Sequence, residues 1–157
     1  MKKAIALLLA LVMVFALCAC GGGDKGTADN GEKVVKIGVF EPASGDSGAG
    51  GKKEMLGMQY ANQETPTVEI GGETYKVELV YSDNGSDSAK AVSAASKLVN
   101  EKVSLVLGSY GSGVSIAASD TFKQAGIPAI GVTCTNPNVT AGNSHYFRIC
   151  FLDPFPV

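Results

Sequence analysis

The chain has 157 residues, of which 45% are hydrophobic and 18% charged, so it has the composition of an ordinary globular protein with material for one core. Without the two lysines of the N-terminal segment discussed next, 11 basic residues stand against 15 acidic ones, a net charge of −4. An acidic chain of this kind excludes nucleic acid as the expected partner.

The first 19 residues are predicted to be an export signal. Lys2 and Lys3 precede the apolar run "AIALLLALVMVFALCA", which is too short to span a bilayer comfortably. The run ends in "LCAC", residues 17–20, and this resembles the lipobox of bacterial lipoproteins, in which cleavage occurs before a lipidated cysteine. On that interpretation Cys20 becomes the mature N-terminus. A plain secretory signal that happens to contain two cysteines is the alternative.

Residues 20–33 are predicted to be a flexible tether. The segment "GGGDKGTADNGEK" contains glycine, Asp and Lys but no large apolar side chain that could join a core. Each buried acyl methylene contributes about 0.8 kcal/mol, so acyl chains on Cys20 would hold the protein at a membrane surface without a spanning helix. We therefore expect an exported protein, lipid-anchored on the outer face of the cytoplasmic membrane, in the periplasm or at the cell surface.

The folded part begins near residue 34 and alternates strand with helix. Apolar runs predict strands at residues 34–40, 75–81, 103–108 and 127–132, and a further one at 145–149; helices are expected at 52–64, 88–101 and from 112 onward. "VEIGGETYKV" adds a hairpin that turns at Gly71 and Gly72. Strands that alternate with helices predict an α/β fold, a parallel sheet with helices on both faces.

Two of the helices show an apolar face and one shows a capping signal. Asp87 stands where the N-cap of the second helix is expected. The predicted faces comprise Ala91, Ala94, Ala95, Leu98 and Val99 in the second helix, and Val114, Ala117, Ala118, Phe122 and Ala125 in the third.

Three loops should gather at the carboxyl ends of the strands, where sheets of this class bind ligands: residues 41–51, 108–113 and 133–137. In "LGSYGSGVS", residues 107–115, small side chains leave backbone N–H groups approachable, and Ser112 stands where a helix begins. A helix start with free N–H groups favours an anion such as a carboxylate. Alternatively, Ser112 is only a helix cap and the glycines only form the turn.

Catalytic patterns fail on their spacing. "GDSGAGGKK" has Asp46 where a phosphate-binding P-loop needs glycine and Lys53 where it needs Ser or Thr. No G-x-G-x-x-G or G-x-S-x-G motif occurs, His145 is the sole histidine, and the cysteines have no zinc-site spacing. We therefore expect no enzyme, no metal and no cofactor. Cys134 and Cys150, the two cysteines beyond the signal, either pair or stay free thiols.

Taken together, these segments resemble the N-terminal part of branched-chain amino acid ABC transporter substrate-binding proteins, which are type I periplasmic binding proteins of the leucine-binding protein family. The resemblance covers nearly all of residues 33–154. It rests on the order and spacing of "IGVFEPASGDSGAGGKKEMLGMQYA", "LVYSDNGSDSAKAVSAASKLV", "LVLGSYGSG", "GIPAIGVTCTNP" and "YFRICFLDPF".

The resemblance implies a site for the zwitterionic end of an amino acid. The Ser112 hydroxyl and nearby N–H groups would bind the α-carboxylate with support from the Thr135 hydroxyl, and the Thr133 carbonyl would accept from the ammonium. The family's aromatic wall of the side-chain pocket falls on Gly50, which leaves side-chain specificity open. The implied ligand-binding set is Gly50, Tyr110, Ser112, Gly113, Thr133, Cys134 and Thr135.

The family continues into a second lobe that closes on the ligand, whereas this sequence stops at "DPFPV". We therefore expect residues 34–152 to be the N-terminal lobe and 153–157 a truncated crossover, in a fragment rather than a free-standing half protein. The implied function is an extracytoplasmic lipoprotein that delivers a branched-chain or other aliphatic amino acid to ABC transporter permease subunits. The alternatives are the ligand-sensing ectodomain of a signalling receptor and a non-functional remnant.

Overall fold

The computed structural model describes residues 32–153. The predicted signal at residues 1–19, its cleavage site at Cys20, most of the predicted tether and residues 154–157 therefore lie outside the described residues. The elements below all belong to the unit that begins at Lys33.

The described residues form a six-stranded sheet in the order β2-β3-β1-β4-β5-β6. All neighbouring strands run parallel except the β2–β3 pair, which is antiparallel. The sheet is thus the predicted parallel one, made mixed by a single hairpin at its edge. The strands are β1 (Val34–Glu41), β2 (Thr67–Ile70), β3 (Glu73–Asp83), β4 (Leu105–Leu107), β5 (Ala129–Gly131) and β6 (Tyr146–Arg148).

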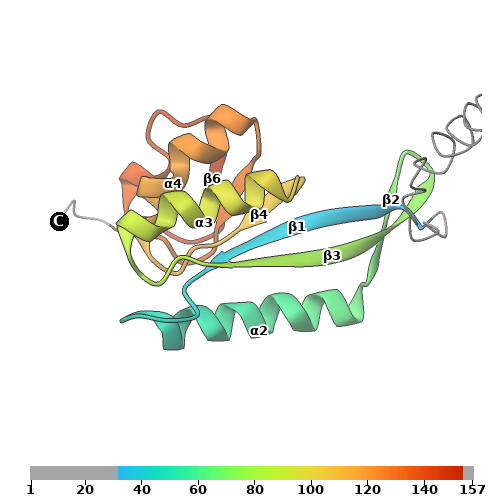
Figure 1. The fold of residues 1–157 in the computed structure, drawn as a ribbon, viewed down its shortest axis with the longest axis horizontal. Helices are drawn as coiled ribbons and strands as arrows, with labels where there is room; N and C mark the ends of the chain where they lie inside the picture. The colour runs from blue at the N-terminus through green and yellow to red at the C-terminus, as the bar shows by residue number, and fades with distance from the viewer. Residues whose placement is uncertain (1–31, 154–157) are drawn as a thin grey trace, which may run out of the picture. The chain divides into compact units, whose positions relative to one another are not determined.

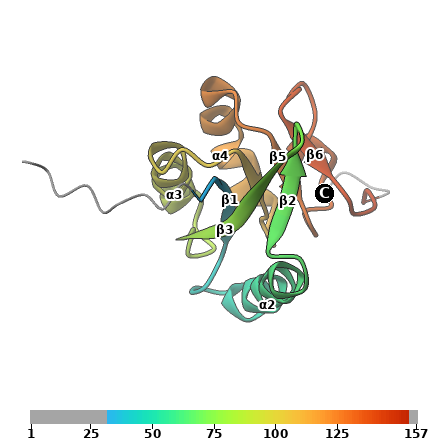
Figure 2. The same ribbon diagram turned by 90° about the vertical axis from the view of Figure 1, so that its right-hand side faces the viewer.

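Helices cover both faces of the sheet, as the alternation of elements predicts. Helices α3 (Ser88–Asn100) and α4 (Ser112–Ala125) pack side by side on one face, and α2 (Gly48–Glu64) lies alone on the other (Figure 1). The end-on view separates the two layers (Figure 2). A short 3-10 helix, η1 (Pro137–Val139), follows β5.

Local signals explain where the elements begin and end. Gly71 and Gly72 both adopt positive φ, 61° and 82°, and so allow the tight turn between β2 and β3. The Asp87 carboxylate accepts hydrogen bonds from the backbone N–H groups of Ala89 and Lys90, which confirms the predicted cap of α3. Gly126 ends α4 in the left-handed conformation, with φ 69°.

The core lies between the sheet and the α3–α4 layer. Four of the five predicted apolar residues of α3 are buried, and Val99 packs against the same cluster. Phe40 from β1 and Phe122 from α4 are fully buried and meet edge to face, with ring centroids 5.5 Å apart. This pair fixes α4, and with it the loop that precedes α4, against the central strand.

Two predictions about the helices need correction. Helix α2 begins at Gly48, four residues before the predicted start, so part of the predicted glycine-rich loop is the first turn of a helix. Backbone N–H groups of Gly50 and Gly51 bond to the Ser47 carbonyl there, which offsets the low helix propensity of glycine. Ala125, predicted to face the core, is exposed because α4 ends at that residue.

The α2 face of the sheet is more open than the other. An apolar cavity of about 700 Å³ lies between α2 and the strands, lined by residues such as Ile37, Met58, Leu79 and Ile130. Within residues 32–153, no helix combines the length and the apolar character needed to cross a membrane.

Candidate functional site

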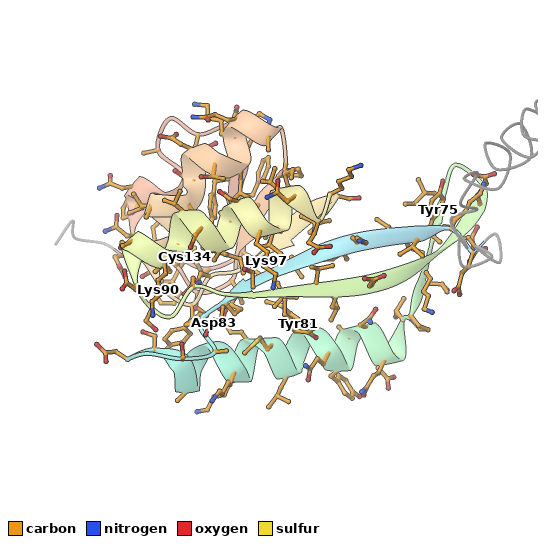
Figure 3. The ribbon with its side chains drawn as sticks, viewed as in Figure 1. Tyr75, Tyr81, Asp83, Lys90, Lys97 and Cys134 are labelled. Atoms are coloured by element: carbon orange, nitrogen blue, oxygen red, sulfur yellow. The ribbon has the colours of Figure 1, made fainter. Side chains whose placement is uncertain are left out.

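The predicted binding loops meet at the carboxyl ends of the strands. Asp83, the last residue of β3, joins two of the connecting segments, because its carboxylate accepts from the N–H groups of Ala43 and Gly85, both at 2.8 Å, and from the Ser44 hydroxyl at 2.7 Å. Burial alone would raise the pKa of Asp83, but these donors outweigh it and lower the pKa. Asp83 and Cys134 lie at this end of the sheet, and Tyr75 lies at the opposite end beside the hairpin (Figure 3).

Three predicted site residues from three separate segments line one cavity of about 600 Å³: Gly50 from the first turn of α2, and Tyr110 and Thr133 from two loops. Lys53 and Glu54 from α2 line the same cavity. The Tyr110 ring lies directly on Gly50, because an ideal Cβ built on that glycine would come within 2.4 Å of the ring carbon Cζ. A side chain at position 50 and the observed Tyr110 ring therefore exclude each other, and Tyr110 forms the aromatic wall beside that glycine.

The N-terminus of α4 is open to an acceptor. Its N-cap residue is Gly111, which has no side chain to cap the first turn, so the alternative in which Ser112 is only the helix cap is wrong. Ser112 is instead the first helical residue, and its hydroxyl oxygen accepts from the Asn136 N–H at 3.2 Å. The Ser112 hydroxyl proton is left free to donate. The backbone N–H groups of the first turn point out of the helix start, where the helix dipole is positive.

Thr133 and Thr135 have different neighbours. The Thr133 hydroxyl is exposed and donates to Glu54 Oε1 at 2.5 Å. The Thr135 hydroxyl donates to Asp153 Oδ2 at 2.7 Å, and the Asp153 N–H donates to the Thr135 carbonyl at 3.1 Å. A ligand carboxylate that takes the Thr135 proton would have to displace the Asp153 carboxylate.

Cys134 lies between these threonines, but its side chain points into the core and is fully buried. Burial is the main reason that the pKa of the Cys134 thiol is raised. Cys134 and Cys150 are both free thiols in the structure. What Cys134 offers to the site is its backbone, since its carbonyl accepts from the Arg148 guanidinium at 3.1 Å.

Arg148, at the end of β6, holds the whole loop that follows β5. Its guanidinium also donates to the carbonyls of Asn136 at 3.0 Å and Pro137 at 3.2 Å, and to the Thr140 hydroxyl at 2.7 Å. Four hydrogen bonds from one planar donor fix the backbone between residues 134 and 140. Sequence reasoning did not identify this role, although a single arginine at a strand end beside a polar loop was visible.

Gly113, the remaining predicted residue, faces a different space. It lines a cavity of about 210 Å³ together with Ser47, Ser86 and Ser88. The structure thus brings Gly50, Tyr110 and Thr133 together in one cavity and places Gly113 at another. Ser112 is joined to the loop that carries Thr135 by the hydrogen bond from the Asn136 N–H.

Two acidic residues were also missed: Glu54, which lines the cavity, and Glu41, which is bonded to the backbone of the lining residue Tyr110. Glu41 ends β1 and is 1% exposed, and its Oε2 accepts from the Tyr110 N–H at 2.8 Å. The pKa of Glu41 is raised to about 10, and burial is the main cause. A hydrogen bond with Glu54 and the charge of Glu54 raise it further, whereas the Tyr110 N–H opposes the shift. The available signal for Glu41 was its position directly after an apolar strand. No comparable signal marks Glu54.

Within residues 32–153, no cluster of three or more His, Cys, Asp or Glu side chains has the arrangement of a metal site. The described donors suit a small polar ligand instead. Backbone N–H groups and the Ser112 hydroxyl can bind an anion, and the Glu54 carboxylate and backbone carbonyls can accept from a cation.

Comparison with known proteins identifies the family of the chain. The family model for periplasmic binding proteins matches residues 34–151. A Leu/Ile/Val-binding protein homolog 2 from Brucella abortus is 33% identical over 143 residues, which is 90% of this chain and 36% of that protein.

Solved structures agree in fold. The leucine-binding protein LivK from Thermotoga maritima matches with a TM-score of 0.72 and 37% identity. The match covers 78% of this chain and 34% of the LivK chain. The branched-chain amino acid transporter substrate-binding protein LivJ from Streptococcus pneumoniae, solved in complex with isoleucine, matches with a TM-score of 0.68 and 33% identity over 76% of this chain and 34% of its own. The chain therefore spans about a third of the length of these relatives.

Proposed function

This chain belongs to the periplasmic binding protein family, and we propose that it supplies one lobe of an amino-acid-binding site whose ligand is delivered to an ABC transporter. The observation that carries the proposal is the cavity where Gly50, Tyr110 and Thr133 meet beside the open N-terminus of α4. Such a site binds and releases a ligand and performs no chemistry on it.

The donors and acceptors suit a zwitterion. The α-carboxylate binds at the first turn of α4, where the Ser112 hydroxyl and uncapped N–H groups converge, and displaces Asp153 from Thr135. The ammonium group lies toward the Thr133 carbonyl and the Glu54 carboxylate. The Tyr110 ring then faces the ligand side chain, which favours an aliphatic amino acid.

The proposal is tested by isothermal titration calorimetry on the full chain with L-leucine, L-isoleucine and L-valine. D-leucine serves as the matched control because it has the same groups in the wrong arrangement. Ser112→Ala removes one hydrogen bond to a charged group and should weaken binding by about 1 to 3 kcal/mol. Equal heats for L- and D-leucine, or an unchanged affinity in Ser112→Ala, would contradict the assigned site.

We also propose export and lipid anchoring at Cys20, with the segment up to residue 33 as the tether. The support is the sequence pattern and the family match, which begins at residue 34. Metabolic labelling with a radioactive fatty acid should mark the wild-type protein and leave Cys20→Ser unlabelled. Labelling that persists in Cys20→Ser would contradict an anchor at that residue.

A further inference from the structure

Two carboxyl groups from different elements meet under the candidate site. Glu41 Oε1 and Glu54 Oε2 are both buried, and neither has a hydrogen-bond partner when the two groups are treated as carboxylates. The other oxygen of each group is engaged, with the Tyr110 N–H and the Thr133 hydroxyl respectively. Since buried polar atoms are almost always satisfied, the two remaining oxygens require an explanation.

A single proton held between the two carboxyl groups explains both unpaired oxygens. Two ionised carboxylates in contact repel each other, whereas one proton between them makes an O–H···O⁻ hydrogen bond and satisfies both oxygens. Glu41 is the better site for that proton, because it is almost fully buried while Glu54 is half-buried and lines the cavity. The raised pKa of Glu41 agrees with this assignment.

We propose that protonated Glu41 donates to Glu54 and that this pair is a positioning element which sets the two binding loops at residues 108–113 and 133–137. The hydrogen bonds form one continuous chain from the Tyr110 N–H through Glu41 and Glu54 to the Thr133 hydroxyl. It connects β1, α2 and both loops. Glu54 keeps its negative charge at the cavity wall, where the ammonium group of the ligand is expected.

The residues around Glu41 leave its carboxyl group little room for another position. Gly108 lies against the Glu41 carboxyl, and an ideal Cβ there would come within 2.5 Å of Glu41 Oε1. The titratable groups that face the pair are Tyr146, whose pKa is raised mainly by burial, and the cavity residues Lys53 and Asp46. Tyr146 is hydrogen-bonded to the Gly108 carbonyl at 2.9 Å, so it supports the same loop and supplies no proton to Glu41.

The binding test of this inference rests on the proposed function, whereas the spectroscopic test does not. The first measurement is the infrared difference spectrum of the full chain at neutral pH. The carbonyl band of a protonated carboxylic acid should be present in the wild type, absent in Glu41→Gln and retained in Glu64→Gln. Glu64 is the matched control because it is an exposed glutamate of the same helix as Glu54.

The second measurement is L-leucine affinity by calorimetry. Glu41→Leu leaves Glu54 Oε2 without its donor and should weaken binding about tenfold, whereas Glu41→Gln offers an N–H donor of the same shape and should restore most of the affinity. The ratio of the wild-type to the Glu41→Gln dissociation constant should rise as the pH is raised above neutrality. Taking this ratio cancels the titration of the ligand's own amino group.

The outcomes separate the two proposals. A wild type that shows the acid band but does not bind leucine supports the pair and contradicts the proposed function. A missing band overturns the pair whether or not leucine binds, as does a Glu41→Gln variant that binds no better than Glu41→Leu. Stabilisation of the wild type, but not of Glu41→Gln, by Ca²⁺ would overturn it in favour of a cation between the carboxyls.

Discussion

Replacing Glu41 with glutamine should stabilise the fold, and by an amount that depends on pH. The pKa of Glu41 rises from 4.5 to about 10 on folding, so the folded state holds a proton that the unfolded state releases above pH 4.5. The contribution of Glu41 to stability is therefore complete below pH 4.5 and is lost as the pH rises toward its folded pKa. Glutamine makes the same two hydrogen bonds without titrating.

The magnitude follows from the linkage relation. Each pH unit above the unfolded pKa removes about 1.4 kcal/mol from the wild type, which amounts to about 3 kcal/mol at neutral pH. Glu41→Gln should thus have the same unfolding free energy as the wild type near pH 4.5 and exceed it by about 1 to 3 kcal/mol at pH 7. Substitution of a buried acid by its amide is rarely expected to stabilise a protein, which makes the sign informative.

Urea unfolding followed by circular dichroism, on both proteins across this pH range, measures the difference directly. Glu64→Gln gives the baseline for loss of an exposed carboxyl. If the wild-type and Glu41→Gln unfolding free energies differ by the same amount at every pH, Glu41 does not carry a proton specific to the folded state, and the shared-proton account is refuted.

Three further changes test the rest of the structure. Phe122→Ala removes a fully buried ring packed edge to face on Phe40 and should lower the free energy of unfolding by about 3 to 5 kcal/mol, measured by urea titration. Gly50→Ala should push the Tyr110 ring off the cavity wall, which is checked by tyrosine fluorescence and by a loss of leucine affinity that Tyr110→Ala also shows. Arg148→Lys keeps the charge but loses the planar set of donors, so hydrogen exchange in residues 133–140 should accelerate while exchange in α3 does not.

Much of the fold was predictable because its signals are local. Strand β1 is a run of β-branched residues, and the Asp87 cap and the alanine face of α3 follow from helix periodicity. The start of α2 was not predictable, because three of its first four residues are glycines, which have low intrinsic helix propensity. Tertiary position, between Pro42 and the Tyr110 ring, decides the conformation there.

The candidate site was likewise predictable in part. The loops at the carboxyl ends of the strands followed from the fold class, and three residues of the segments predicted as loops line one cavity. The Tyr110 ring on Gly50 could not be foreseen, because the two residues are 60 positions apart and neither has a pattern that implicates the other. The role of Arg148 was equally hidden, since three of its four partners are backbone carbonyls that any sequence provides.

The position of Glu41 shows how a binding site gains rigidity from a residue that the ligand never touches. A buried acid at the end of the central strand costs stability at neutral pH, and an aliphatic side chain there would avoid that cost. The same acid bonds to the backbone of one loop and, through Glu54, to the side chain of another. Loops that are ordered before the ligand arrives lose less entropy when it binds. Glu41 thus exchanges fold stability for a preorganised site, and this is why Glu41→Gln should raise the unfolding free energy while Glu41→Leu should weaken binding.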